Sequence, residues 1–153
     1  MKKLLKIGTL LLTVIMLFNL TACSSFGKVQ KALETIGYEI IEGEETEASK
    51  EAEKDDSVAK IHMFTNANTL SLLEGYKVTL VTVIEFKSTK ELVEYFKESN
   101  TLQGIVQDLE DERTIEEIYE ELKDEGLACG NCLIVPIGFD TEAVLEAIDE
   151  VNG

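Results

Sequence analysis

The chain has 153 residues, with 30 acidic against 14 basic side chains and a formal net charge of −16. Such acidity excludes nucleic acid as a plausible partner, because binding it depends on clustered lysine and arginine that neutralise phosphates. The length suits one domain and is too short for the two-lobed architecture of many solute-binding proteins.

Residues 1–22 have the parts of a secretory signal peptide. Lys2, Lys3 and Lys6 form a positive front, and residues 7–18 form an apolar stretch that is too short and wrongly flanked for a transmembrane helix. The segment closes with Leu20-Thr21-Ala22-Cys23. The alternatives are an uncleaved anchor helix, or a plain secretory signal with an incidental Cys23.

This closing tetrapeptide resembles the lipobox of bacterial lipoproteins. The resemblance implies that Cys23 receives a diacylglyceryl group, with acyl chains such as palmitate, and that the chain is cut just before it. Residues 23–153 would then lie on the extracytoplasmic face of the cell membrane, with 11 basic and 30 acidic groups and a formal charge of −19. We expect the membrane contact to depend on this anchor and any protein partner to be basic.

A helix is predicted directly after Cys23, with Ser24 or Ser25 as its cap and Gly37 at its end. Its apolar residues follow helical spacing and are Phe26, Val29, Leu33 and Ile36. A short strand is predicted over residues 38–41. Residues 42–56 hold eight acids and no large apolar residue, which indicates an exposed acidic helix or a linker with no part in a core. A calcium or basic-partner site there lacks the glycine and alternating oxygens of a calcium loop.

Two strands are predicted next, over residues 57–65 and 76–86. The second has apolar residues on both faces, so we expect it to be central and covered on both sides. Leu70, Leu72 and Leu73 lie between the strands and either tuck under the sheet or form an exposed apolar lip.

Capping boxes at Ser88 and Thr114 predict two helices, and a third short helix is predicted over residues 102–109. A strand over residues 133–137 and a last helix capped by Asp140 complete the chain. Because Pro136 cannot donate to a ladder, we expect that strand to be an edge strand or to end there.

The element order predicts one α+β domain with a three- or four-stranded antiparallel or mixed sheet and helices mainly on one face. A ferredoxin-like split β-α-β arrangement is the single topology that fits best. The acidic helix fits this topology least well, since a helix that is polar on all sides has no apolar face to pack on the sheet.

Cys129-Gly130-Asn131-Cys132 is the reactive-looking motif of the body. In thioredoxin-like proteins such a pair opens a helix, which lowers the thiol pKa, whereas here a strand pattern follows. We interpret Cys129 and Cys132 as a small structural disulfide, with free thiols and a redox pair as alternatives. It would stabilise the fold by about 2 kcal/mol.

No metal site or cofactor is predicted. Zinc favours four ligands that are mainly cysteine and histidine, and the only histidine, His62, is interpreted as a surface or half-buried sheet residue. The motifs of zinc proteases, serine hydrolases and phosphate-binding loops are absent from the sequence. An enzyme is therefore the less favoured class.

The hypothesis is a lipid-anchored, non-catalytic binding protein. Besides its lipobox, the chain resembles the small, uncharacterised membrane lipoproteins of Gram-positive bacteria over residues 84–89 and 131–136, a resemblance that carries no function. Two alternatives remain: a thiol-disulfide redox protein acting through Cys129 and Cys132, and an immunity or inhibitor lipoprotein whose acidic surface neutralises a basic toxin or lytic enzyme.

Overall fold

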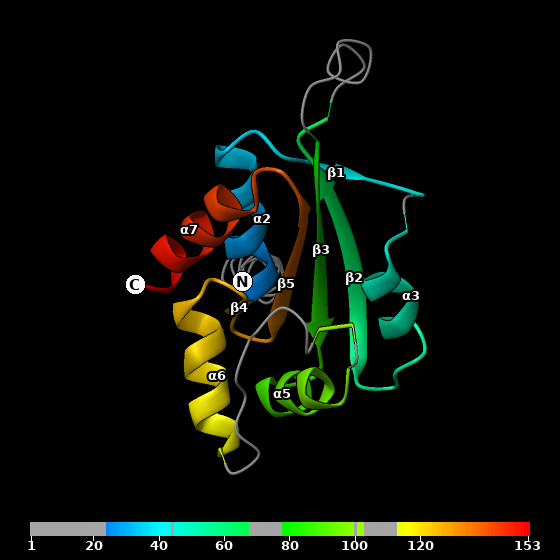
Figure 1. Ribbon diagram of the computed structural model, residues 1–153, viewed down its shortest axis with the longest axis vertical. Helices are drawn as coiled ribbons and strands as arrows, with labels where there is room; N and C mark the ends of the chain where they lie inside the picture. The colour runs from blue at the N-terminus through cyan, green and yellow to red at the C-terminus, as the bar shows by residue number, and fades with distance from the viewer. Residues whose placement is uncertain (1–23, 44, 68–77, 100, 103–112) are drawn as a thin grey trace, which may run out of the picture.

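A five-stranded antiparallel sheet runs through the computed structural model, which describes residues 24–43, 45–67, 78–99, 101–102 and 113–153 (Figure 1). Five helices pack around this sheet in the described part of the chain. The predicted α+β class and single small domain are confirmed. The elements in chain order are α2 (Ser25–Thr35), β1 (Glu39–Ile41), α3 (Glu47–Ala52), β2 (Val58–Thr65), β3 (Thr79–Phe86), α5 (Thr89–Glu98), α6 (Ile115–Asp124), β4 (Ala128–Cys129), β5 (Cys132–Gly138) and α7 (Thr141–Asn152).

The strands lie in the order β1-β2-β3-β5-β4, and every neighbouring pair is antiparallel. Strand β3 is central, as predicted, with Phe64 of β2 opposite Val81 and Ile134 of β5 opposite Val83. The sheet has five strands rather than three or four because the residues before the Cys129 turn form β4. The split ferredoxin-like arrangement is wrong, since β1 lies at the edge and pairs directly with β2.

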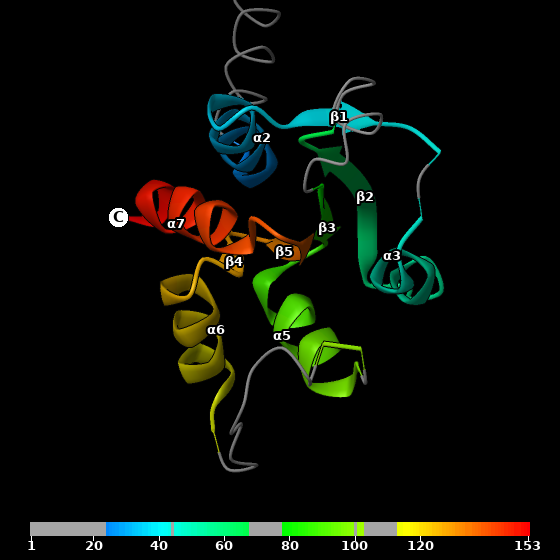
Figure 2. The same cartoon turned by 45° about the horizontal axis from the view of Figure 1, so that its top comes forward.

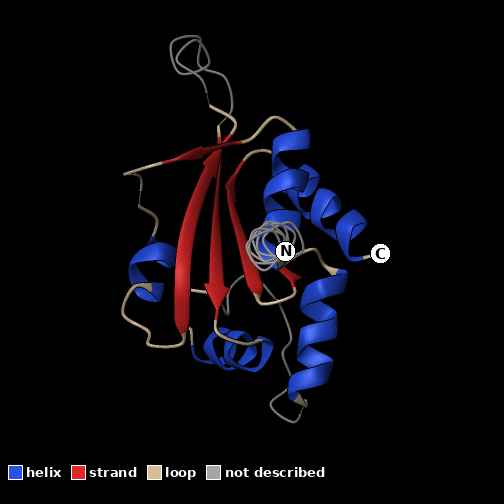
Figure 3. Cartoon of the chain, turned by 180° about the vertical axis from the view of Figure 1, so that it is seen from behind, coloured by secondary structure: helices blue, strands red, loops and turns tan. Residues whose placement is uncertain are grey.

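Helices cover both faces of the sheet, so the prediction of helices mainly on one face is wrong. Helices α2 and α7 pack on the face that includes Phe64, Val81, Val83 and Ile134, which we call the α2 face. Helices α3, α5 and α6 pack on the opposite face, the α5 face. Figure 2 shows α2 and α5 on either side of the strands, and Figure 3 shows the strands and helices from behind. Both faces of β3 are apolar, and each therefore needs its own cover.

Three helices begin at the serine or threonine that the sequence indicates. The Ser24 hydroxyl accepts a hydrogen bond from the Gly27 amide at 3.1 Å at the start of α2. Ser88 caps α5 in the same way, and Thr114 and Glu117 form a reciprocal capping box on α6. Gly37, with φ of +88°, follows the end of α2. These local signals therefore set the helix boundaries.

Helix α7 begins differently from the prediction. Asp140 occupies the position before the helix, but its side chain makes no capping hydrogen bond. Instead its backbone N–H donates to the hydroxyl of Thr79 on β3 at 2.9 Å. The bond ties the start of α7 to the central strand, and Val144 and Ile148 of α7 are fully buried against the sheet.

The acidic segment is part of the core, contrary to prediction. Helix α3 lies within it, and Ala48 and Ala52 are 1% and 0% exposed in the cluster on the α5 face. Its cap, Thr46, shares a 2.9 Å hydrogen bond with Thr82 of β3. Small methyl groups at spacing i and i+4 allow close approach to the sheet, while Glu47 and Glu53 are exposed. The absence of large apolar residues did not mean the absence of a packing face.

Strand β5 behaves as an edge strand at Pro136. Its outer neighbour β4 reaches only Cys132 and Leu133, so Pro136 lies beyond it, opposite Val81 of β3. A residue without an N–H is tolerated there because none of the described strands pairs with that side. The edge prediction therefore holds for the part of β5 around Pro136, whereas β5 as a whole lies between β3 and β4 and continues to Gly138.

Several predictions lie outside the described residues. These are the lipobox and Cys23, the leucines at positions 70, 72 and 73, the start of the strand predicted from residue 76, and all but the first residue of the helix predicted over residues 102–109. Leu102 is described and is 1% exposed.

The packing of α3 predicts a position-specific effect of a new charge. Ala52→Glu places an unpaired carboxylate against the α5 face and should lower the free energy of unfolding by roughly 3 kcal/mol or more. Ala59→Glu makes the same chemical change at an exposed position of β2 and should cost less than about 1 kcal/mol. Urea unfolding of both variants measures the difference, and equal costs would show that α3 does not pack on the sheet.

Candidate functional site

The polar and reactive residues of the body meet under the first turn of α2. Phe26 of α2 lies on His62 of β2, His62 pairs with Glu85 of β3, and Glu85 stands opposite Cys132 of β5. Cys132 in turn stands opposite Cys129 of β4. We call this group the α2 seat: Phe26, His62, Glu85, Cys129 and Cys132.

His62 and Glu85 form the polar centre of the seat. The His62 Nε2 lies 2.8 Å from a Glu85 carboxylate oxygen, and the two side chains are 9% and 21% exposed. The rings of Phe26 and His62 stack with centroids 3.6 Å apart and planes at 13°. A shielded histidine–carboxylate pair is costly to break, because separation leaves a desolvated polar group unpaired. The Phe26 ring therefore shields the hydrogen bond between His62 and Glu85, whose loss would destabilise the fold.

The prediction that His62 is a half-buried sheet residue is confirmed. Within the described ranges, no group of three or more histidine, cysteine or acidic side chains is arranged to hold a metal ion. His62 uses its Nε2 on Glu85 and one ring face on Phe26. These contacts make it a structural residue of the seat.

Cys129 and Cys132 face each other across the tight turn between β4 and β5. The turn consists of Gly130, with φ of +58°, and Asn131, whose side-chain amide donates to the Phe86 carbonyl at 2.6 Å. A Cβ at Gly130 would come within 1.9 Å of the Ser25 hydroxyl oxygen, so the turn lies directly against the start of α2. Only glycine fits a position that needs both a positive φ and this close approach.

Both cysteines are buried free thiols in the structure, with exposures of 4% for Cys129 and 0% for Cys132. The disulfide inferred from the sequence therefore stays a prediction. Burial raises the pKa of both thiols above the ordinary value of 9.0, and the Glu85 carboxylate raises the pKa of Cys132 further. Lys28 and Lys123 oppose the increase only at Cys129.

This environment is the reverse of the one a redox nucleophile needs. An exchange-active thiol has a lowered pKa and access to its substrate, usually at a helix N-terminus. Cys129 and Cys132 lie on strands, beneath a helix, and favour the protonated form. The geometry gives the thiol-disulfide redox alternative no support.

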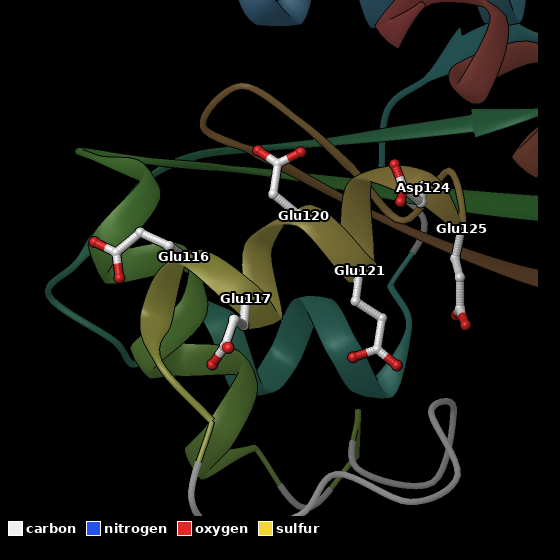
Figure 4. Close-up of a pocket in the computed structure, with 6 residues that line it drawn as sticks. All are labelled: Glu116, Glu117, Glu120, Glu121, Asp124 and Glu125. Atoms are coloured by element: carbon white, nitrogen blue, oxygen red, sulfur yellow. The ribbon is translucent and has the colours of Figure 1, made fainter.

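The carboxylates of α6 form a second conspicuous feature (Figure 4). They surround a shallow surface hollow and are Glu116, Glu117, Glu120, Glu121, Asp124 and Glu125. Glu120 and Asp124 point to one side of the helix and Glu117 and Glu121 to the other, so the six do not converge. This arrangement suits long-range attraction of cations or basic proteins rather than a coordination site.

Some of these acids already have partners. Glu117 accepts from the Thr114 backbone and side chain in the capping box, which lowers the pKa of Glu117. Glu121 pairs with Arg113, and Glu120 lies 3.4 Å from the Lys123 ammonium. The helix nevertheless keeps a surplus of negative charge.

The lipidation candidate Cys23 precedes the described residues. Among the described helices, none is long and apolar enough to cross a membrane.

Comparison with known proteins yields no match. We find none among protein-family models, curated proteins or solved structures.

Sequence reasoning missed Glu85 and the role of Phe26. Glu85 was one acid among 30, and Phe26 was one member of an apolar helix face. Their partnership with His62 depends on the strand register and on where α2 packs. The available clue was Glu85 itself, the one charged residue of β3.

Export across the membrane, which the lipobox-like motif predicts, would allow Cys129 and Cys132 to pair, and we then expect them to be oxidised in the isolated protein. Alkylation after unfolding without reductant should label neither cysteine, and labelling after reduction should modify both, as mass spectrometry can measure. Two free thiols in freshly isolated protein would contradict the disulfide.

In reduced, folded protein, Phe26→Ala should speed alkylation of the two thiols by about tenfold, because a truncated aromatic contact makes local opening easier. Phe139→Ala, directly after the end of β5 and away from the turn, is the control.

A second prediction concerns pH. The unfolded reduced chain ionises its thiols near pH 9, whereas the folded chain keeps them protonated. The free energy of unfolding of the reduced form is therefore unaffected by the thiols below about pH 9. Above that pH it falls, by at most ~1.4 kcal/mol per pH unit for each thiol. Urea unfolding between pH 8 and 10 should show this loss in reduced but not in oxidised protein. Equal pH dependence of the two forms would show that the thiols are not sealed.

Proposed function

We propose that the protein is a lipid-anchored, extracytoplasmic binding protein, and that α2 keeps its folded domain directly against the bilayer. The lipobox-like Leu20-Thr21-Ala22-Cys23 supports the anchor. Two acyl chains suffice for stable attachment, at ~0.8 kcal/mol for each buried methylene.

The observation that carries the proposal is the position of α2. The helix begins at Ser25, two residues after Cys23, and its Val29 and Leu33 are fully buried in the core. A lipid on Cys23 would thus be attached to a core element rather than to a free tether. Two extended residues span only ~7 Å, so the domain would sit at the headgroups.

The α2 seat supports binding rather than catalysis. Its histidine, carboxylate and thiols are the chemically suggestive residues of the described body, and they are directed toward one another beneath α2. A nucleophile or general base must reach its substrate, and Cys132 is completely covered. These groups are best explained as holding α2 in place.

The acidic surface suggests the chemistry of the partner. The surplus carboxylates of α6 and the net charge of −16 favour a basic protein. The α6 surface also favours a second candidate function, an immunity or inhibitor lipoprotein that neutralises a basic toxin or lytic enzyme. In either case the bilayer surface itself repels the domain, so the anchor determines where the protein acts.

Substitution of the acceptor cysteine tests the anchor. Cys23→Ser should release the protein from the membrane fraction or leave it mislocalised, because the mature chain has no other membrane signal in this proposal. Cys129→Ala also removes one cysteine but should stay with the membrane. Fractionation and immunoblotting measure both variants, and unchanged retention of Cys23→Ser would show that residues 1–22 act as an uncleaved anchor.

A further inference from the structure

We propose that the outer edge of β2 binds an extended segment of a basic partner protein as an added strand. The inference rests on the proposed binding role and specifies where and how binding occurs.

The edge of β2 is only partly covered. Strand β1 pairs with Met63, Phe64 and Thr65 alone, through Ile41, Ile40 and Glu39 respectively. Strand β2 begins at Val58, so its first five residues have no strand on their outer side within the described part of the chain. A strand edge of this kind offers unpaired backbone groups to an extended peptide.

A hollow of about 480 Å³ lies along this uncovered edge. Phe26 of α2 lines one side and Ser49 and Glu53 of α3 line the other, while β1 closes the end at Ile41. We call it the edge slot. It continues the line of β1 and is open between helices from the two faces of the sheet. A longer β1 would pair with β2 on this side; Glu42 and Gly43, which follow Ile41, line the hollow instead.

The lining matches the alternation of a strand. His62 points to the α2 face, where it meets Phe26, and Ile61 packs on the α5 face. Successive side chains of an added strand would likewise alternate between the Phe26 wall and the α3 wall. Ile40 of β1 is 46% exposed at the same edge and extends the apolar lining. Aliphatic side chains in the partner segment therefore find apolar contacts.

The charged residues that line the edge slot favour some extended partner segments over others. Glu42 and Glu53 line the slot and are exposed, against one cation, Lys60. A segment with basic side chains is favoured over an acidic one. A second copy of this chain is disfavoured, because two strongly acidic bodies repel each other.

A peptide of alternating lysine and valine, eight residues long, is the probe. Full-length protein in a non-ionic detergent should bind it saturably, as fluorescence anisotropy measures, and hydrogen exchange should slow at residues 58–62. The same peptide with alternate amides N-methylated cannot form the ladder and should bind at least about tenfold more weakly. Equal binding of the two peptides, protection at α6 instead of β2, or no saturable binding would overturn the proposal.

Charge reversal at the rim provides matched variants. Glu53→Lys lies at the slot, and Glu146→Lys makes the same change on the exposed side of α7. We expect Glu53→Lys to weaken binding about fivefold beyond Glu146→Lys. Equal effects would show that only net charge attracts the peptide. Because the protein is in detergent, a failure here leaves the anchor proposal standing, and membrane retention of Cys23→Ser would leave the slot standing.

Discussion

The contact between α2 and the sheet is the interaction on which the rest of the structure depends. Val29 and Leu33 fill the core on the α2 face, and Phe26 covers the hydrogen bond between His62 and Glu85. The same turn of helix lies against Gly130 and so restrains the hairpin that carries the two thiols. Removing α2 would expose apolar surface, the hydrogen bond between His62 and Glu85 and both thiols together, which makes the helix an integral element rather than a connector.

Much of this fold follows from local rules that a sequence displays. Ser24, Ser88 and Thr114 cap helices because a side-chain oxygen satisfies a free amide in the first turn, and this depends on residues three positions apart. The apolar residues of β3 made it recognisable as the central strand, since both faces had to be buried. Pro136 marked an edge through the N–H it lacks. None of these inferences required knowledge of distant contacts.

What could not be predicted depends on tertiary pairing. Ala48 and Ala52 look neutral in an acidic stretch, and only the closeness of β3 makes their methyl groups a packing face. The α2 seat needs the strand register to bring Glu85 beside His62, and then needs α2 above them. The apolar residues of β3 indicated cover on both sides, but they did not say which helices would supply it. Charge and helical spacing alone do not encode these neighbours.

In the proposed arrangement, α2 would join a lipid anchor on Cys23 to the folded core without a flexible tether. Only Ser24 separates Cys23 from the helix, and its side chain is already engaged as the helix cap. Neutron reflectometry of the lipidated protein on a supported bilayer measures this directly. The account predicts a protein layer in contact with the headgroups, with a solvent gap no wider than ~10 Å. A wider water layer between the bilayer and the protein would show that α2 leaves the sheet and acts as a tether, and would contradict the account.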